Sequence, residues 1–193
     1  AFEAGIAEAK AEIDAIIANE EEPTFENTIE AMENSGRTLN KVAGVFYNLM
    51  EANTNDQMQE IAEKVAPMMT EYSMYVSLND ALFQKVKAVY DNKENLALTA
   101  EEKTVLQNIY DRFVDGGALL SDEQKEELRK LNLELSMLQL QFGQNLTHET
   151  NKTFVTVDKV EELDGLPQAN IEAAAKMAEA NGQPGKYMFN MQR

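Results

Sequence analysis

Apolar residues recur at steps of three and four along most of the chain. In the first segment they are Phe2, Ile6, Ala9, Ile13 and Ile16, which all fall on one face of a helix with 3.6 residues per turn. The same spacing returns in further stretches up to about residue 150. Such a chain can bury its apolar side chains only by packing helices against one another, so we predict a mainly α-helical bundle.

Cap-forming residues and helix breakers set the bounds of these helices. Asn79 is a good helix N-cap, and Thr99 with Glu102 and Ser121 with Gln124 fit the capping-box spacing. The predicted helices cover about residues 2–17, 24–49 with a bend at 35–36, 57–75 with a kink at 67, 79–89, 99–113, 122–147 and 167–181. We therefore expect an irregular antiparallel bundle of about seven helices.

The helix predicted over residues 122–147 is apolar on two faces. One stripe is Leu128, Leu131, Leu135, Leu138 and Phe142, and the other is Leu133, Met137 and Leu140. Because both stripes need apolar partners, we expect this helix to be the centre of the bundle and to be covered on both sides.

The pattern changes after residue 150. Residues 153–157 and 186–191 are rich in β-branched and aromatic side chains, and an alanine-rich helical segment separates them. We predict a small two-stranded antiparallel β element near the C-terminus, completed by the bundle or by sequence beyond Arg193. The predicted division is a helical bundle over residues 1–151 and, over 152–193, the strand–helix–strand start of a further part.

Charge and composition exclude several classes of function. The chain of 193 residues carries 34 Asp and Glu against 17 Lys and Arg, a formal net charge of −17. This charge repels nucleic acid and anionic lipid, so we expect neither as a partner. No run approaches 18 apolar residues, and no signal peptide pattern opens the chain. The sequence begins inside a helical pattern and ends inside a predicted strand, which we interpret as a piece of a longer protein.

The single histidine and the absence of cysteine limit the chemistry. His148-Glu149-Thr150-Asn151-Lys152 looks like the zinc-binding H-E-x-x-H helix motif, but Lys152 stands where the second imidazole is required. A di-iron carboxylate site would need Glu-x-x-His, and Asn145 stands in place of the Glu. We therefore predict no catalytic, cofactor-binding or metal-binding residue in this chain.

Ten methionines invite a second interpretation of the bundle. Met50, Met58, Met68, Met69 and Met74 fall in its middle helices. Methionine fills irregular gaps in cores, which we take as its main role here, and it also lines adaptable peptide-binding grooves, which stays as a minor alternative.

A series of short segments along the chain forms a recognisable set. It begins with residues 23–31, Pro-Thr-Phe-Glu-Asn-Thr-Ile-Glu-Ala, followed by Ser35-Gly36. It continues through Phe46, residues 52–56, Leu78-Asn79 with Leu82-Phe83, Phe113-Val114 with Gly117-Ala118, residues 131–145, Gly165-Leu166 and Gly185-Lys186-Tyr187. These segments, which cover nearly the whole chain, resemble the thimet-type zinc metallopeptidases, the group of thimet oligopeptidase, neurolysin and oligopeptidase A. They are most similar to the bacterial peptidyl-dipeptidase (dipeptidyl carboxypeptidase) branch.

The resemblance implies an N-terminal fragment of such a peptidase. In this family the H-E-x-x-H helix and the glutamate ligand lie far downstream, while the N-terminal helices form one wall of a deep channel that admits short peptides. The implied cofactor is zinc, bound by the parent enzyme and not by this chain. The implied partners are short peptide substrates and the missing C-terminal catalytic half. The implied reaction is removal of C-terminal dipeptides by a metal-activated water.

A non-enzymatic interaction or scaffold protein, complete as it stands, is the alternative. Exposure of a large apolar patch would favour the fragment, because a complete module buries such patches. For the compartment we expect the bacterial cytoplasm, with the periplasm left open as an alternative.

Overall fold

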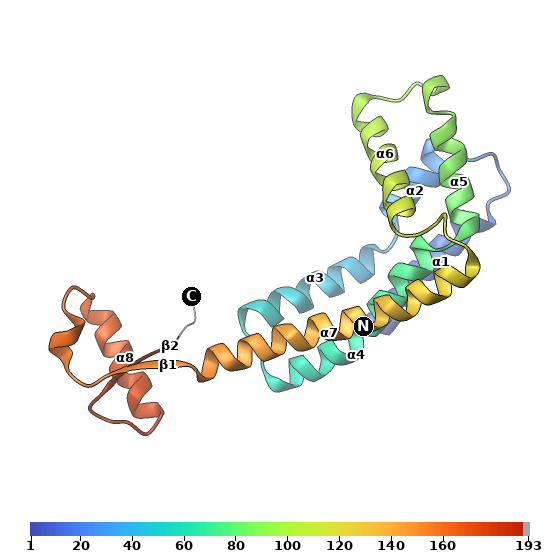
Figure 1. The fold of residues 1–193 in the computed structure, drawn as a ribbon. Helices are drawn as coiled ribbons and strands as arrows, with labels where there is room; N and C mark the ends of the chain where they lie inside the picture. Colours follow the sequence, from blue (N-terminus) through green and yellow to red (C-terminus); the bar gives the residue numbers. More distant parts are fainter. Residues whose placement is uncertain (191–193) are drawn as a thin grey trace. The chain divides into compact units, whose positions relative to one another are not determined.

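The computed structural model describes residues 1–190, which are mostly helical (Figure 1). The helices are α1 (Phe2–Ala18), a π-helical turn (Phe25–Glu30), α2 (Ala31–Asn34), α3 (Arg37–Ala52), α4 (Asp56–Ser77), α5 (Asp80–Asp91), α6 (Ala100–Asp115), α7 (Asp122–Lys152) and α8 (Gln168–Ala180), with short 3-10 turns at Lys93–Asn95 and Val160–Leu163. Strands β1 (Phe154–Val157) and β2 (Tyr187–Asn190) pair antiparallel. The prediction of a mainly helical chain with a small antiparallel β element is confirmed.

The contacts divide the chain into two compact units. The first covers Ala1–Leu140, and the second begins at Gln141. This division falls inside α7, whereas the division predicted from the sequence follows residue 151. The predicted functional boundary therefore stays a prediction.

Helix starts lie where the capping signals placed them. The side chain of Asn79 accepts a hydrogen bond from the backbone N–H of Leu82, and Thr99 with Glu102 forms a reciprocal capping box. The hydrogen bonds from Thr99 lower the pKa of the Glu102 carboxyl, the backbone bond contributing most. Ser121 and Gln124 form the same reciprocal pair at the start of α7. Each pair satisfies backbone donors that a helix start leaves free.

The predicted weak points behave in two different ways. At Ser35 and Gly36 the helix breaks, and Gly36 adopts a left-handed φ of 69° that suits glycine. At Pro67 the helix does not break, since α4 runs from Asp56 to Ser77 with the proline inside it.

The main core of the first unit lies where α5 and α6 meet α1 and the π-helical turn. Its buried side chains include Ile13, Ile16, Ile29, Leu82, Phe83, Val86, Val89, Leu106, Ile109 and Phe113. Phe83 lies close to Phe113, with ring centroids 5.8 Å apart. These are the residues at the predicted three-and-four spacing, so the stripes of α1, α5 and α6 are buried as expected.

A second, smaller core forms where α1 crosses α3. It contains Ile6, Ala9 and Leu39, with Met68, Met69 and Tyr72 packed against it. At the crossing, a Cβ built on Gly5 would lie 3.1 Å from the Cα of Leu39. A side chain at this position would therefore fit only if the neighbouring backbone of α3 shifted by a few tenths of an ångström.

The leucines of α7 depart from the sequence expectation. We predicted that both apolar faces of this helix would be covered, but Leu131, Leu135 and Leu138 are 56%, 51% and 54% exposed. The part of α7 in the first unit packs through another face, which includes Lys125. The expectation of a fully covered central helix is therefore wrong. The helix is also longer than predicted, since it ends at Lys152.

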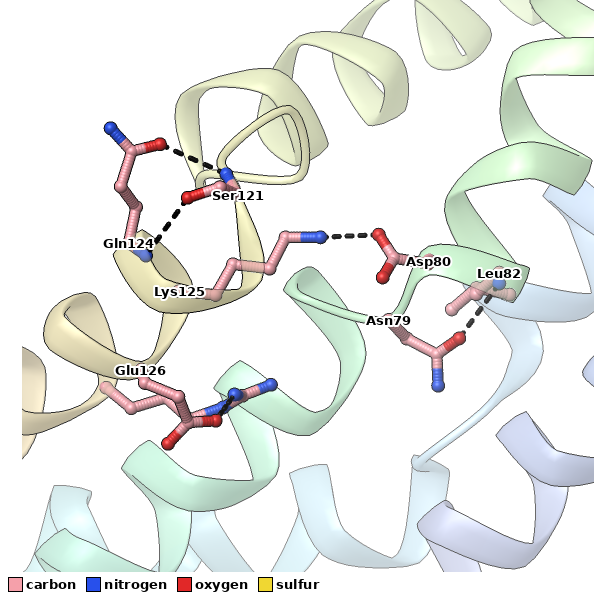
Figure 2. Close-up of polar contacts among 8 residues, drawn as sticks. Asn79, Asp80, Leu82, Ser121, Gln124, Lys125 and Glu126 are labelled. Atoms are coloured by element: carbon pink, nitrogen blue, oxygen red, sulfur yellow. Dashed lines mark hydrogen bonds and ion pairs between the residues drawn. The ribbon is translucent and has the colours of Figure 1, made fainter.

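Lys125 ties the first turns of α7 to the start of α5 (Figure 2). Its side chain is 4% exposed, and its Nζ forms an ion pair with the carboxylate of Asp80, which is 64% exposed. A buried ammonium group needs such a partner, because removal from water is costly for a charge. This pair fixes where α7 begins on the first unit.

The second unit packs α8 against the β element. Residues Phe154–Val157 pair with Asn190–Tyr187, and α8 contacts β2. Leu163, Ala174, Ala178 and Met188 are buried. The β element is thus packed against α8, the helix that connects its two strands. Met191, the last residue of the predicted strand, lies outside the described residues.

Between residues 1 and 190, no helix has the length and apolarity needed to cross a membrane.

Gly5→Ala should destabilise the protein, and Gly44→Ala serves as its control. The new Cβ at position 5 would force α1 and α3 apart, at a cost of about 1–2 kcal/mol in the free energy of unfolding. Gly44 lies in α3, and a Cβ added there would meet nothing within 4 Å, so alanine at this position should stabilise by about 0.5–1 kcal/mol. Urea denaturation measures both, and a Gly5→Ala variant as stable as Gly44→Ala would contradict the close crossing.

Asp80→Ala should destabilise the protein more than Lys125→Met does. Loss of Asp80 leaves a buried ammonium group without its carboxylate, at a cost of about 1–3 kcal/mol. Lys125→Met replaces that group by an apolar side chain of similar length, so its effect should stay within about 1 kcal/mol. Asp56→Ala, which removes a first-turn carboxylate from α4, controls for the helix-dipole effect of about 0.3–1 kcal/mol. The pair would be refuted if Asp80→Ala cost no more than Asp56→Ala.

Candidate binding groove

The first unit contains an open groove of about 790 Å³. Side chains from α1, α2, α3, α4, α6 and α7, all before residue 141, line it. The break between α2 and α3 also lies on its wall, since Ser35 and Gly36 both contribute. A groove of this size accommodates a small molecule or a few residues of peptide.

Short polar side chains run along two helices of the groove. Thr70, Ser73 and Ser77 come from α4, and they recur at steps of three and four. Asn132, Ser136 and Gln139 come from α7 at steps of four and three. The spacing puts each set on one face of its helix. The two helices therefore present hydroxyl and amide groups to the groove.

Some of these polar groups are free to bind a ligand. Thr70 Oγ1 donates to the backbone carbonyl of Ala66, and Ser136 Oγ donates to that of Leu133. Over residues 1–190 the structure gives no side-chain hydrogen bond to Ser73, Asn132 or Gln139. An amide offers both donors and an acceptor, as a peptide backbone requires.

The charges along the groove balance one another. Arg112 Nη2 lies 3.1 Å from Glu33 Oε1, and both side chains are exposed. Burial, followed by the negative charge of Glu12, raises the pKa of the nearby Tyr72 hydroxyl, which keeps this side chain neutral. Glu12 itself accepts a hydrogen bond from the backbone N–H of Gly36 at 2.6 Å. The groove is thus close to neutral although the whole chain is strongly acidic.

Two of the five singled-out methionines lie in the groove. Met69 and Met74 line it together with Met32, whereas Met50, Met58 and Met68 are not among its lining residues. Met74 is 5% exposed and so also fills the core. Met74 thus fills the core as the main interpretation expected, and a peptide-binding role of the groove methionines stays a prediction.

A smaller cleft of about 600 Å³ lies beside the Lys125–Asp80 pair. Lys10, Tyr75, Arg129 and Lys130 are among its lining residues. A hydrogen bond to Asp14 is the main cause that raises the pKa of Tyr75 to about 12. Lys10 Nζ lies 4.9 Å from the Tyr75 ring centroid, and Arg129 pairs with Glu126. Most polar groups of this cleft are thus engaged within the protein.

His148 lies far along α7, near its C-terminal end, and is exposed. Lys152, which occupies the position of the second imidazole in the zinc motif, is the last residue of the same helix. Within the part of the chain that the structure describes, no three His, Cys, Asp or Glu side chains come together in a group able to hold a metal ion.

The groove was not identified from the sequence. One sequence pattern could have indicated the polar face of α4 that borders the groove. Thr70, Ser73 and Ser77 are spaced so that they share one face of this helix. The same spacing is also typical of a solvated helix face. Only the placement of α4 and α7 shows that these side chains border a common space.

Comparison with known proteins identifies relatives along nearly the whole chain. No family model matches it. Dipeptidyl carboxypeptidase of Escherichia coli (strain K12) is 35% identical over 189 residues, which is 98% of this chain and 28% of the relative. Dipeptidyl carboxypeptidase of Salmonella typhimurium matches with the same identity and coverage. Oligopeptidase A of Haemophilus influenzae is 25% identical over 169 residues, 88% of this chain and 25% of the relative.

The chain therefore spans 25–28% of the length of these relatives. The relatives are named as peptidases, and a thimet-like oligopeptidase of Dictyostelium discoideum is also among them, 25% identical over 175 residues. The resemblance derived from residues 23–31 and the later segments is confirmed. Along almost its entire length, this chain is a homologue of one stretch of dipeptidyl carboxypeptidase and, more distantly, of oligopeptidase A.

Proposed function

We propose that this chain is the N-terminal, channel-wall lobe of a zinc metallopeptidase that removes C-terminal dipeptides from short peptides. The observation that carries the proposal is the similarity to dipeptidyl carboxypeptidase, 35% identity over 98% of the chain. In this proposal the chain shapes the substrate channel, and the catalytic residues belong to the greater part of the relatives' length that it does not span.

The groove supports a role in holding peptides. A peptide in extended conformation presents N–H and C=O groups along both edges, and Asn132 and Gln139 can donate to and accept from such groups. Met32 and Met69 add flexible apolar surface that adapts to different side chains. A near-neutral groove with these groups suits a peptidase that accepts many sequences.

The residues present do not fit a zinc site. The chain has one histidine and no cysteine, and the structure brings no metal-binding group together within residues 1–190. Zinc sites in peptidases use histidine and carboxylate ligands around one ion. We therefore assign the zinc and the reaction itself to residues outside this chain.

The product of the complete open reading frame should release C-terminal dipeptides from short peptides with a free carboxyl end. A chelator should abolish the release and added zinc should restore it. Chromatography with mass spectrometry measures the dipeptide. The isolated 193-residue chain with zinc should release none. Turnover by the isolated chain would refute the assignment of the site, and a complete product without dipeptide release would refute the proposed function.

Gln139→Ala in the complete product should weaken peptide binding. Loss of one hydrogen bond of about 1 kcal/mol corresponds to a roughly fivefold higher KM with little change in kcat. Gln57→Ala is the matched control, because Gln57 is an exposed glutamine of α4 that does not line the groove. Equal KM values for both variants and the unchanged protein would show that the groove does not hold the substrate.

A further inference from the structure

The exposed leucines of α7 form a regular stripe. Leu131, Leu135 and Leu138, which we call the leucine seam, follow one another at steps of four and three. More than half of each side chain is exposed. Alternating steps of three and four are the spacing of the a and d positions in a coiled coil, where each side chain inserts between residues of a partner helix.

Leu131 and Leu138 lie on the outer side of α7, whereas Leu135 lies between this side and the groove, which it also lines. The side of α7 that packs on the first unit carries Lys125, which is buried, and Asn132 and Ser136, which are half-buried. Leu138 follows Ser136 by two residues, roughly 200° around the helix axis. The side that packs on the first unit also carries Leu128, Leu133 and Leu140, which are half-buried, so the inward side of α7 is mixed in character, while the leucine seam stays more than half exposed. A helix whose only contact is the first unit would not be expected to carry a second, regular leucine stripe on a side that this unit leaves exposed.

The residues on either side of the leucine seam indicate which charge a partner helix should carry. With Leu131 and Leu138 at d positions and Leu135 at an a position, the g positions hold Glu127 and Glu134. The e positions hold the uncharged Asn132 and Gln139. Residues at e and g determine which helix pairs with which, through opposite charges. A second copy of this chain, with a net charge of −17, is poorly matched to the two glutamates, whereas a helix flanked by Lys and Arg is well matched.

We propose that the leucine seam is the docking surface for an amphipathic helix with leucine-like side chains at a and d and with Lys or Arg at e and g. The helix belongs to the same polypeptide, in the greater part of the relatives' length that this chain does not span. The assignment of this helix to the same polypeptide rests on the proposed function. The surface and the charge of its occupant follow from α7 alone.

The surface is tested with two synthetic 28-residue helical peptides and the 193-residue chain. Both peptides carry Leu at a and d, and one carries Lys at e and g while the other carries Glu. Fluorescence anisotropy at low salt should give a dissociation constant at least about tenfold smaller for the Lys peptide. Equal binding of both peptides, or binding of neither, overturns the proposal.

Two leucine variants locate the binding on α7. Leu138→Ser should weaken binding of the Lys peptide at least about tenfold, and circular dichroism should show an unchanged fold because the side chain is 54% exposed. Leu49→Ser on α3 is the matched control, since Leu49 is also 54% exposed, and its dissociation constant should stay within about twofold. Dimerisation of the unchanged chain that Leu138→Ser abolishes, seen by sedimentation velocity, would overturn the proposal in favour of a second copy.

Cysteine labelling identifies the source of the helix. The chain has no cysteine, so Leu138→Cys introduces its one thiol, and peptide mapping follows the reaction of that thiol with a maleimide. In the complete open reading frame product the reaction should be at least about tenfold slower than in the 193-residue chain. Equal rates would overturn the assignment to the same polypeptide. Because neither the peptide nor the labelling experiment measures hydrolysis, failure of the seam and failure of the proposed peptidase activity are separate results.

Discussion

The attachment of α7 depends on one buried charge. Lys125 lies in the first turns of α7 with 4% of its side chain exposed, and it reaches the carboxylate of Asp80 at the start of α5. A buried ammonium group without a carboxylate is strongly unfavourable, so α7 is held with this side toward the first unit. The residues on the same side, Asn132 and Ser136, are then brought to the groove. The pair, together with the contact of Leu128 beside Gly117, therefore favours the orientation that brings Asn132 and Ser136 to the groove.

The groove and the leucine seam are two consequences of one orientation. If α7 were turned by half a turn, the leucine seam would face the first unit, and Asn132 together with the half-buried Leu128 and Leu133 would face water. The observed orientation leaves apolar surface unburied on the outward side, which is unfavourable for a helix that packs only here. It is favourable when a further helix covers the seam, because both sides of α7 then have suitable partners. Leu135, which belongs to the seam and also lines the groove, connects the two surfaces.

The helices were predictable from the sequence because their signals are local. The capping residues Asn79, Thr99 and Ser121 satisfy backbone groups within three residues of themselves, so their effect does not depend on the rest of the fold. The left-handed Gly36 is local in the same sense. The groove was not predictable, because it depends on where α4 and α7 lie relative to each other. That placement follows from distant contacts such as Gly5 with Leu39 and Lys125 with Asp80.

The two apolar stripes of α7 show where prediction from the sequence ends. Their spacing was evident, and it was natural to expect both to be buried. Spacing tells which side chains share a face, but it does not tell which face meets the rest of the chain. Lys125 decides this, because its long apolar stem and its charged end fit a site beside an acidic residue at a helix start. A lysine inside a helix that is otherwise rich in leucine is therefore informative when its partner is known. In our proposal, the exposed leucines of the seam are then the surface for a further helix.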